Sequence, residues 1–169
     1  MGTRSSRLAV LLAIVPVVAI GCGQEQESPV ELPTVRLAVV AGADHGGKPY
    51  TPTMTQEVTT TPPWQGDADG TGQALLTVNL GQREICWQTS ASNITLPATA
   101  SHIHKAEPGI RGPIVVPLSP PGASGTANGC ASGLDAALVK DILTNPGAYY
   151  VNVHTSDFPA GAVRGQLGS

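Results

Sequence analysis

The chain has 169 residues, enough for one ordinary domain with a short additional segment. Charged residues make up only 12% and aromatic residues 4%, while 20 glycines and 15 prolines favour short strands joined by many turns. The formal net charge is −3, so the chain has no excess of basic residues that would form a patch for DNA or RNA, and we expect no nucleic-acid partner.

The first 22 residues have the organisation of an export signal. Arg4 and Arg7 form a positive start, and the apolar run at 8–20 is too short to cross a bilayer comfortably. The run ends in Ala19-Ile20-Gly21-Cys22, which resembles the lipobox of bacterial lipoproteins, whose cysteine is lipidated. We therefore expect residues 1–22 to be a lipoprotein signal peptide with Cys22 anchored to a membrane through lipid. An ordinary secretory signal cut nearby is the alternative.

The segment after this signal is polar and contains several prolines. We expect residues 23–34 to be a flexible tether between the lipid anchor and a domain at 35–169. Without residues 1–21 the chain has seven basic and twelve acidic residues, a formal charge of −5. The predicted location is outside the cytoplasm, in the periplasm or on the cell exterior, and the sequence does not decide which membrane leaflet carries the anchor.

The use of cysteine agrees with export. With Cys22 assigned to lipid, Cys86 and Cys130 remain, and an oxidising compartment normally pairs two such residues. We expect one disulfide, which would contribute about 3 to 4 kcal/mol for a loop of this length. Two free thiols that bind a metal are the alternative, less suited to a compartment outside the cytoplasm.

Most of the chain has the pattern of short strands separated by turns. Apolar and polar residues alternate with a period of two, and turn-forming residues follow most of these runs. Strands are predicted at 35–40, 50–61, 74–80, 84–89, 101–104, 114–118, 149–155 and 163–167. The one at 50–61 ends in a break at Pro62 and Pro63. The strand at 114–118 is predicted near a sheet edge, because Pro113 and Pro117 cannot donate to a ladder.

One helix interrupts the strands. Apolar residues keep a helical spacing at 134–142, with Ser132 as the predicted cap and Asp135 completing a capping box. Asn145-Pro146-Gly147 predicts its end. The sequence therefore predicts an all-β fold, a Greek-key β-barrel or sandwich with one short crossover helix over one end.

Two loops contain polar residues without a predicted site. Asp67 and Asp69 hint at a calcium loop, but the later ligands of a helix-loop-helix calcium site are missing. A turn that leads into a hairpin is the better interpretation. His45 lies in a glycine-rich loop and is interpreted as a solvated residue.

The residues most indicative of chemistry are histidines. Successive side chains of a strand point to opposite faces, so His102 and His104 share one face while Ile103 points to the other. The same alternation places His154, in the strand after the helix, and Arg164, in the last strand, on polar faces. If these three strands are neighbours, three imidazoles and one guanidinium gather on one polar patch outside the barrel core.

These motifs resemble a known family. The signature of the CHRD domain consists of several motifs in a fixed order, and this sequence has similar motifs in the same order at 102–104, 109–116, 150–155 and 161–167. That domain is repeated in the developmental protein chordin and occurs singly in many bacterial exported proteins. The resemblance covers residues 50–168 and implies an all-β extracytoplasmic module without a firmly established activity, so function has to be argued from the site. One departure is segment 105–108, which lengthens the usual link between the histidines and the following glycine.

A weaker resemblance is to the copper-zinc superoxide dismutases. These enzymes are Greek-key barrels with a His-x-His strand, a later Val-His strand, a C-terminal arginine and one disulfide. The match implies that His102, His104 and His154 hold copper and that Arg164 attracts superoxide. No histidine is left in the segment between His104 and His154 to bridge to zinc, His45 is far upstream and a poor substitute, and the zinc-binding loop is absent. The residues therefore permit at most a mononuclear copper or zinc site.

Three kinds of function remain open from the sequence. The preferred one is a membrane-tethered, non-catalytic module that binds a protein or envelope component; its histidines would tie loops to the sheet, and Arg164 would pair with Glu107 or Asp157. The second is a copper- or zinc-binding protein that uses the three histidines as ligands. Arg164 would be a catalytic residue only if this protein had a dismutase-like activity. The third is a structural spacer. Hydrolase motifs such as Gly-x-Ser-x-Gly and His-Glu-x-x-His are absent from the sequence.

Overall fold

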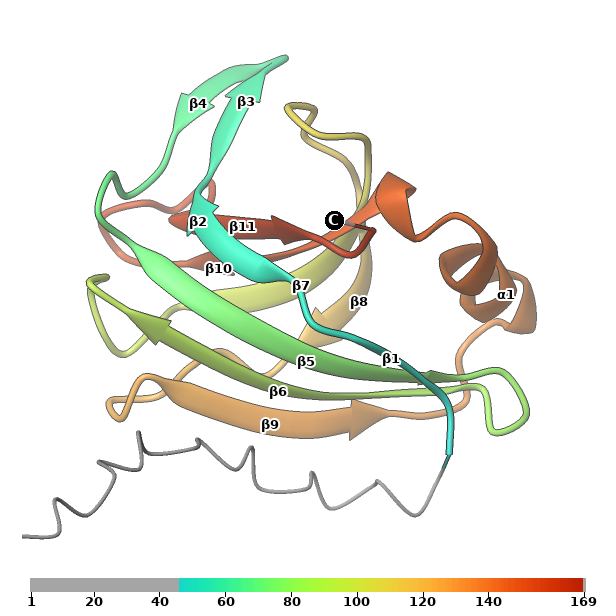
Figure 1. Ribbon diagram of the computed structural model, residues 1–169. Helices are drawn as coiled ribbons and strands as arrows, with labels where there is room; N and C mark the ends of the chain where they lie inside the picture. Colours follow the sequence, from blue (N-terminus) through green and yellow to red (C-terminus); the bar gives the residue numbers. More distant parts are fainter. Residues whose placement is uncertain (1–45, 169) are drawn as a thin grey trace, which may run out of the picture. The chain divides into compact units, whose positions relative to one another are not determined.

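The computed structural model describes residues 46–168, which form an all-β domain with one short α-helix (Figure 1). Outside the described residues lie the expected signal peptide at 1–22 with Cys22, the tether at 23–34, the strand at 35–40 and His45. Within residues 46–168, no helix is long and apolar enough to cross a membrane.

Nine strands build the main sheet. They are β1 (Lys48–Tyr50), β2 (Thr53–Gln56), β5 (Thr71–Asn79), β6 (Glu84–Ser92), β7 (Ala100–Lys105), β8 (Ile114–Leu118), β9 (Thr126–Ala131), β10 (Tyr149–His154) and β11 (Val163–Gln166). The order is β8-β7-β10-β11-β2-β5-β6-β9, with every pair antiparallel and β1 pairing with β5. The end strands β8 and β9 lie next to each other without sharing a ladder, so the sheet is almost closed into a barrel (Figure 1). The predicted all-β barrel is confirmed.

The three strands that contain the histidines and Arg164 are neighbours in the sheet. β10 pairs with β7 on one side and with β11 on the other, and Val151 lies opposite both Ile103 and Gly165. β8 is the last strand of the sheet path, as its prolines predicted. β5 and β6, which correspond to the predicted strands at 74–80 and 84–89, form a hairpin closed by a turn in which Arg83 has a φ of 50°.

The barrel interior is filled by the apolar faces of these strands. Ile103 from β7 and Val151 and Val153 from β10 are fully buried in one continuous core. The helix α1 (Ala136–Thr144) packs over one end of the barrel and adds Val139 and Ile142 to the same core (Figure 1). Each such side chain contributes about 1.5 to 3 kcal/mol through burial, so this core is the main source of stability.

The helix begins later than the sequence predicts. Asp135, and not Ser132, is its N-cap: the Asp135 side chain accepts a hydrogen bond from the backbone N–H of Ala137 at 2.9 Å. Gly133 has a φ of +70°, a left-handed conformation that does not fit the first turn of a helix, so Ser132 stays outside. The predicted end is confirmed, because Asn145 is the C-cap before the short 3-10 turn η2 (Pro146–Ala148).

The predicted break at Pro62 and Pro63 is instead a second, two-stranded sheet. β3 (Val58–Thr60) pairs with β4 (Pro63–Gln65), where proline is tolerated because each strand has a free edge. This hairpin projects from the barrel (Figure 1). Its tip contacts the loop at 106–113 between β7 and β8, to which the backbone N–H of Thr60 donates a hydrogen bond at Gly109, 2.8 Å long.

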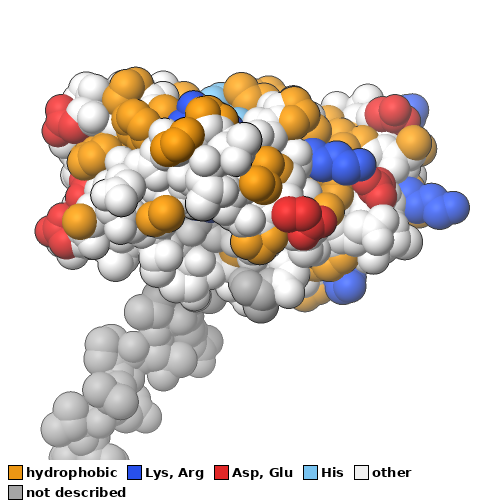
Figure 2. Space-filling model, turned by 90° about the horizontal axis from the view of Figure 1, so that it is seen from above, with side chains coloured by type: hydrophobic (Ala, Val, Ile, Leu, Met, Phe, Trp, Pro, Cys, Tyr) orange, Lys and Arg blue, Asp and Glu red, His pale blue; other side chains and the backbone are white. Residues whose placement is uncertain are grey.

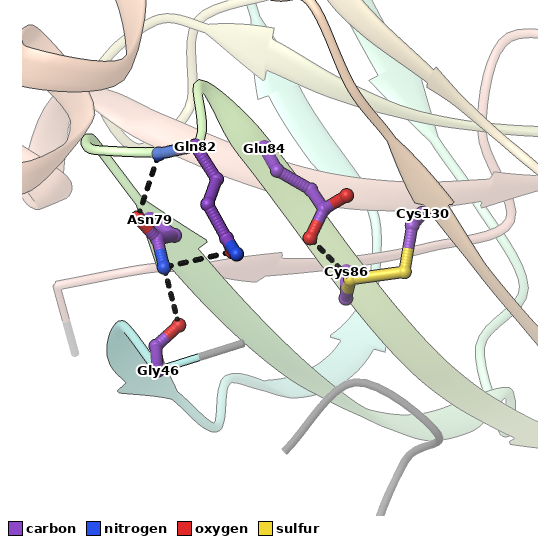
Figure 3. Close-up of a disulfide and its surroundings, with 6 residues drawn as sticks. All are labelled: Gly46, Asn79, Gln82, Glu84, Cys86 and Cys130. Atoms are coloured by element: carbon purple, nitrogen blue, oxygen red, sulfur yellow. Dashed lines mark hydrogen bonds between the residues drawn. A yellow bond between two sulfur atoms is a disulfide. The ribbon is translucent and has the colours of Figure 1, made fainter. Parts of the chain in front are cut away.

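The predicted disulfide is confirmed. Cys86 and Cys130 are bonded to each other directly across the β6–β9 ladder (Figure 3). Glu84 lies beside them with its Oε1 3.5 Å from Cys86 Sγ, but a disulfide sulfur has no hydrogen, so this contact is not a hydrogen bond. Nor is this trio a metal site, although its atoms are close together, because sulfurs joined in a disulfide are not thiolates.

Candidate functional site

The three predicted site histidines come together on the outer face of the barrel. His102 and His104 belong to β7, and His154 is the last residue of β10. The ring centroid of His102 lies 5.4 Å from that of His104 and 5.0 Å from that of His154. One ring nitrogen of each histidine lies within 4.8 Å of those of the other two. We call these three residues the histidine cluster.

The polar patch that the alternation predicted lies outside the barrel core, but most of its side chains are buried. Tyr150 and Asn152 are completely covered, and His104 and Arg164 are only 6% and 8% exposed. The other two imidazoles are partly buried. The loop at 106–113 accounts for much of this burial, because several of the face's side chains bond to it directly. Strand alternation identifies a face, but it does not reveal what lies on that face.

Arg164 holds this loop against the sheet. Its Nη1 donates to the carbonyl of Ile110 at 2.7 Å, and its Nη2 donates to the carbonyl of Glu107 at 2.9 Å. Nη2 also donates to the side chain of Gln166 at 3.1 Å. The guanidinium lies on the ring of Tyr150, with Cζ 3.3 Å from the ring centroid. The predicted pairing with Glu107 is therefore made through the backbone and not through the carboxylate.

This placement differs from the one that the dismutase resemblance implies. Attraction of a small anion needs guanidinium N–H groups that face the ligand, whereas those of Arg164 are engaged by main-chain carbonyls. Asp157, the other predicted partner of Arg164, accepts a hydrogen bond from the hydroxyl of Thr95 instead. The role of Arg164 is positional, because it fixes the loop that contains Gly112.

The backbone of the same loop orients His104. The Nδ1 of His104 lies 2.9 Å from the carbonyl oxygen of Gly112, and since a carbonyl only accepts, Nδ1 carries the proton and Nε2 the lone pair. Nε2 is buried and makes no hydrogen bond of ordinary geometry within the described residues, although the side chain of Asn152 lies close enough to counter part of the lowering of the His104 pKa. Tyr150 stacks on the imidazole at 4.8 Å between centroids. Position 112 requires glycine, because a Cβ there would lie 2.0 Å from the carbonyl oxygen of Lys105.

His154 is oriented in the same way. Its Nδ1 lies 3.1 Å from the carbonyl oxygen of Pro159 and donates to it, which leaves the lone pair on Nε2. Nε2 lies 3.2 Å from His102 Nδ1, which is able to donate. It also lies 3.1 Å from Oδ1 of Asn152, another acceptor. Two acceptors at this distance repel each other. The repulsion is removed if the Asn152 amide is rotated so that its NH₂ group faces His154, or if a cation binds to both atoms.

A buried carboxylate, Glu57, lies next to this network. Glu57 is 0% exposed between β2 and β3, and its Oε2 accepts a hydrogen bond from Nδ2 of Asn152 at 3.1 Å. Burial raises the pKa of Glu57, an effect that the hydrogen bond from Asn152 and the charges of Arg164 and Arg111 partly offset. Position 161 requires glycine, because a Cβ there would lie 1.8 Å from Glu57 Oε2. Glu57 lies within the residues that the family resemblance covers, but the sequence indicated no role for it.

Arg111 is a second residue to which the sequence assigned no role. Its guanidinium Cζ lies 5.8 Å from the ring centroid of Trp64 on β4. The indole N–H of Trp64 donates to the carbonyl of Gly161 at 2.7 Å, which fixes this ring. The Nε of Arg111 is buried and has no hydrogen-bond partner in the part of the chain that the structure describes. The charge of Arg111 helps to lower the pKa of His104 and of His154, so this guanidinium acts on the cluster.

The cluster is uncharged at neutral pH. Burial lowers the pKa of His102, to which the charge of His104 adds, and burial likewise lowers the pKa of His104. Burial lowers the pKa of His154 to about 4. Neutral imidazole is the form that binds a metal ion, so no proton has to leave the rings at pH 7 before a metal enters.

Comparison with known proteins identifies the fold family. The sequence model of the CHRD domain matches residues 50–167. The chain belongs to the CHRD domain family. No curated protein and no solved structure is significantly similar to it. Membership confirms the resemblance seen over 50–168 but supplies no activity, so the function of this CHRD domain has to come from its site.

The histidine cluster of this CHRD domain has the donor set of an open metal site, in which three protein ligands leave one position for water or another ligand. Ligand nitrogens around tetrahedral zinc are about 3.3 Å apart. His102 Nδ1 and His154 Nε2 already have this spacing at 3.2 Å. A ring nitrogen of His104 lies within 4.8 Å of a ring nitrogen of each of the other two histidines. Carbonyls hold the opposite nitrogens of His104 and His154, as is usual for metal-binding histidines.

Proposed function

We propose that this protein is an exported, lipid-anchored CHRD module with a non-catalytic binding role at the bacterial cell envelope. The organisation of residues 1–22 and the lipobox-like ending at Cys22 support export and anchoring. The disulfide between Cys86 and Cys130 suits an oxidising compartment. The partner in this role is a protein or another envelope component.

We further propose that the histidine cluster binds one copper or zinc ion. The observation that carries this proposal is the geometry of His104, whose Nδ1 is held by a carbonyl while its buried Nε2 makes no hydrogen bond of ordinary geometry among the described residues. An unsatisfied buried acceptor costs about 1 to 3 kcal/mol. A metal ion shared with His102 and His154 would remove this cost and would separate the facing lone pairs of His154 and Asn152.

The donor set favours two metals. Imidazole nitrogens suit both zinc and copper, and for the same nitrogen ligands copper(II) is bound more tightly than zinc(II). We therefore expect both ions to bind, with copper the tighter. When bound, the metal would supply a Lewis-acidic position open to one further ligand.

A dismutase-like activity has less support than binding. It would need a guanidinium with free N–H groups near the metal, and Arg164, the residue that the dismutase resemblance indicated, uses its own to hold the loop at 106–113. The role that we propose for the histidine cluster is therefore binding of a metal ion without catalysis.

Metal titration tests the proposed site. The full chain, purified in detergent, is titrated with zinc and with copper against a competing chelator dye, beside the His102→Ala/His104→Ala/His154→Ala variant. We expect one ion per chain in the parent and a loss of at least a hundredfold in affinity in the triple variant, because removal of ligands costs more than the 10- to 100-fold typical of their supporting partners.

The matched control for this titration is His45→Ala, which removes a histidine outside the described residues. It should bind metal like the parent. The circular dichroism spectrum of each variant confirms that the domain is folded. Equal metal binding by the parent and the triple variant would refute the proposed metal site.

Anchoring is tested separately by Cys22→Ser. Cells that express the parent or this variant are labelled with an alkyne fatty acid and separated into membrane and soluble fractions. The parent should carry the label and sediment with membranes, while the variant should do neither. Label on the Cys22→Ser variant, or a soluble unlabelled parent, would contradict a lipid anchor at this residue.

A further inference from the structure

We infer that an anionic oxygen ligand, a carboxylate or carbonate, binds together with the metal ion at the histidine cluster and contacts Arg111. This inference rests on the proposed metal site and assigns the position that three protein ligands leave open.

The two arginines near the cluster differ in what they bind. Arg164 donates to two main-chain carbonyls and lies on Tyr150. The Arg111 guanidinium instead lies near Trp64, with its buried Nε unpartnered among residues 46–168. A buried guanidinium nitrogen is normally hydrogen-bonded, because leaving a donor of a charged group unpaired costs free energy. A bound anion would pair with this group, since guanidinium matches the planar geometry of a carboxylate or carbonate.

The charges around the cluster also favour an anion. The side-chain charges that act on Glu57 are those of Arg164 and Arg111, and those that act on the histidines are these arginines and the imidazoles themselves. With neutral imidazoles, two guanidinium groups face at most one carboxylate. A divalent metal ion would increase this excess of positive charge in a poorly solvated site, which is unfavourable unless an anion enters with it.

The cluster is reachable from outside by a small ligand. His102, His154 and Arg111 are each partly exposed. Figure 2 looks down on this side and shows a histidine side chain at the surface beside a lysine or arginine, among hydrophobic side chains. Ile110, which is next to Arg111 in the loop at 106–113, is an exposed hydrophobic residue at 40% exposure, and its carbonyl accepts a hydrogen bond from Arg164. Apolar surroundings lower the local dielectric and strengthen the attraction between an anion and Arg111.

The inference has a thermodynamic consequence that is measurable. If the anion binds more tightly when the metal is present, then the metal must bind more tightly, by the same factor, when the anion is present. Arg111 should carry much of this coupling because it would contact the anion and would not be a ligand of the metal. Substitution of Arg111 should therefore remove the effect of the anion without removing the metal site.

The test is a zinc titration of the full chain in a non-coordinating buffer with acetate, with bicarbonate, or with chloride as the reference anion. We expect acetate or bicarbonate to lower the zinc Kd roughly tenfold in the parent, within the usual range of coupling between sites. Arg111→Gln should bind zinc at least as tightly as the parent in chloride, since a repelling charge is gone, and should show no effect of either anion. Arg111→Lys keeps the charge but loses the planar pair of donors. This variant should retain part of the decrease in zinc Kd that acetate or bicarbonate causes in the parent.

The matched control is Arg83→Gln, in the exposed turn between β5 and β6, which should behave like the parent. An effect with acetate alone identifies a carboxylate ligand, and an effect with bicarbonate alone identifies carbonate. A zinc Kd in the parent that is the same in all three anions, or an anion effect that persists in Arg111→Gln, overturns the inference and leaves the metal site standing. A parent that binds no zinc overturns the metal site and, with it, the inference.

Discussion

The two faces of β10 are both buried, but by different means. On the inner face, Tyr149, Val151 and Val153 are fully buried within the apolar core of the barrel. On the outer face, Tyr150 and Asn152 are just as inaccessible. There the cover is a loop, tied to the sheet by hydrogen bonds from side chains to its carbonyl groups.

This difference separates what stabilises the domain from what orients its site. Apolar packing contributes in proportion to the area buried and imposes little direction on a side chain. Polar groups have to be paired when they are buried, and each pairing fixes which atom faces where. The outer face therefore specifies ring orientations in the histidine cluster, and the inner face supplies most of the stability.

The largest effect should come from the inner face. Ile103 points into the core between the two histidines of β7 and is 0% exposed. Ile103→Ala should lower the free energy of unfolding by about 2 to 5 kcal/mol, through lost burial and the cavity left behind. Urea unfolding measures this loss. The zinc affinity of the folded variant should stay close to that of the parent. A variant that keeps its stability but loses zinc affinity would contradict the conclusion that the inner face supplies stability and the outer face orients the site.

The outer face should make stability depend on pH in metal-free protein. The pKa of His154 is about 4 when folded and about 6.5 when unfolded. Between these values the unfolded chain binds the proton and the native chain does not, so the contribution of His154 to the free energy of unfolding is present above pH 6.5 and is lost as the pH falls toward 4. The pKa values of His102 and His104 are lowered too and act in the same direction. The raised pKa of Glu57 acts in the opposite direction above pH 4.5.

We expect a net loss on the order of 2 kcal/mol between pH 7 and pH 4.5, less than the unscreened shift of His154 alone implies. Urea unfolding in the presence of a chelator, at a series of pH values, measures it. His154→Gln should flatten the curve because glutamine does not titrate. A parent and a variant with the same pH dependence would contradict the assignment of this loss to His154.

A third substitution loosens the cover of the outer face. Arg164→Met removes the donors to the carbonyls of Ile110 and Glu107 but keeps an extended side chain over Tyr150. We expect a loss of about 1 to 3 kcal/mol, the usual cost of hydrogen bonds to a charged group. Amide hydrogen exchange should increase mainly at 106–113. Unchanged exchange in this loop would show that other contacts hold it.

The smallest effect should come from a site that belongs to neither face. Asp135→Ala removes the N-cap of α1 and should cost about 1 kcal/mol. Ser132→Ala, at the cap that the sequence predicted, should cost nothing measurable. Thermal unfolding compares the two. A larger effect at Ser132 than at Asp135 would contradict the observed start of the helix.

The part of the site that depends on local geometry could be predicted from the sequence. Alternation along a strand is enough to place His102 and His104 opposite to Ile103, because it requires only a period of two. Adjacency of β7 and β10 joins residues 50 positions apart, such as Asn152 and His102, and no local pattern contains that information. The family resemblance and the polar residues on one face of each strand made the adjacency of these strands a reasonable expectation.

What the sequence did not reveal depends on loops. Whether Arg164 faces solvent or main-chain carbonyls is decided by the path of 106–113, and that path follows from contacts with the β3–β4 hairpin. For the same reason Arg111 had no distinguishing signal, since its position relative to Trp64 depends on two loops meeting. The start of α1 was misplaced because a left-handed Gly133 is not visible in a capping pattern.

The most direct test of the central claim is the X-ray absorption spectrum of the zinc-loaded full chain, which counts the imidazoles bound to the metal. We expect three imidazole nitrogens at about 2.0 Å and one further light ligand. In His104→Ala, one imidazole should be lost. A spectrum with one imidazole or none in the parent, or one that does not change in His104→Ala, would contradict the metal site at the histidine cluster.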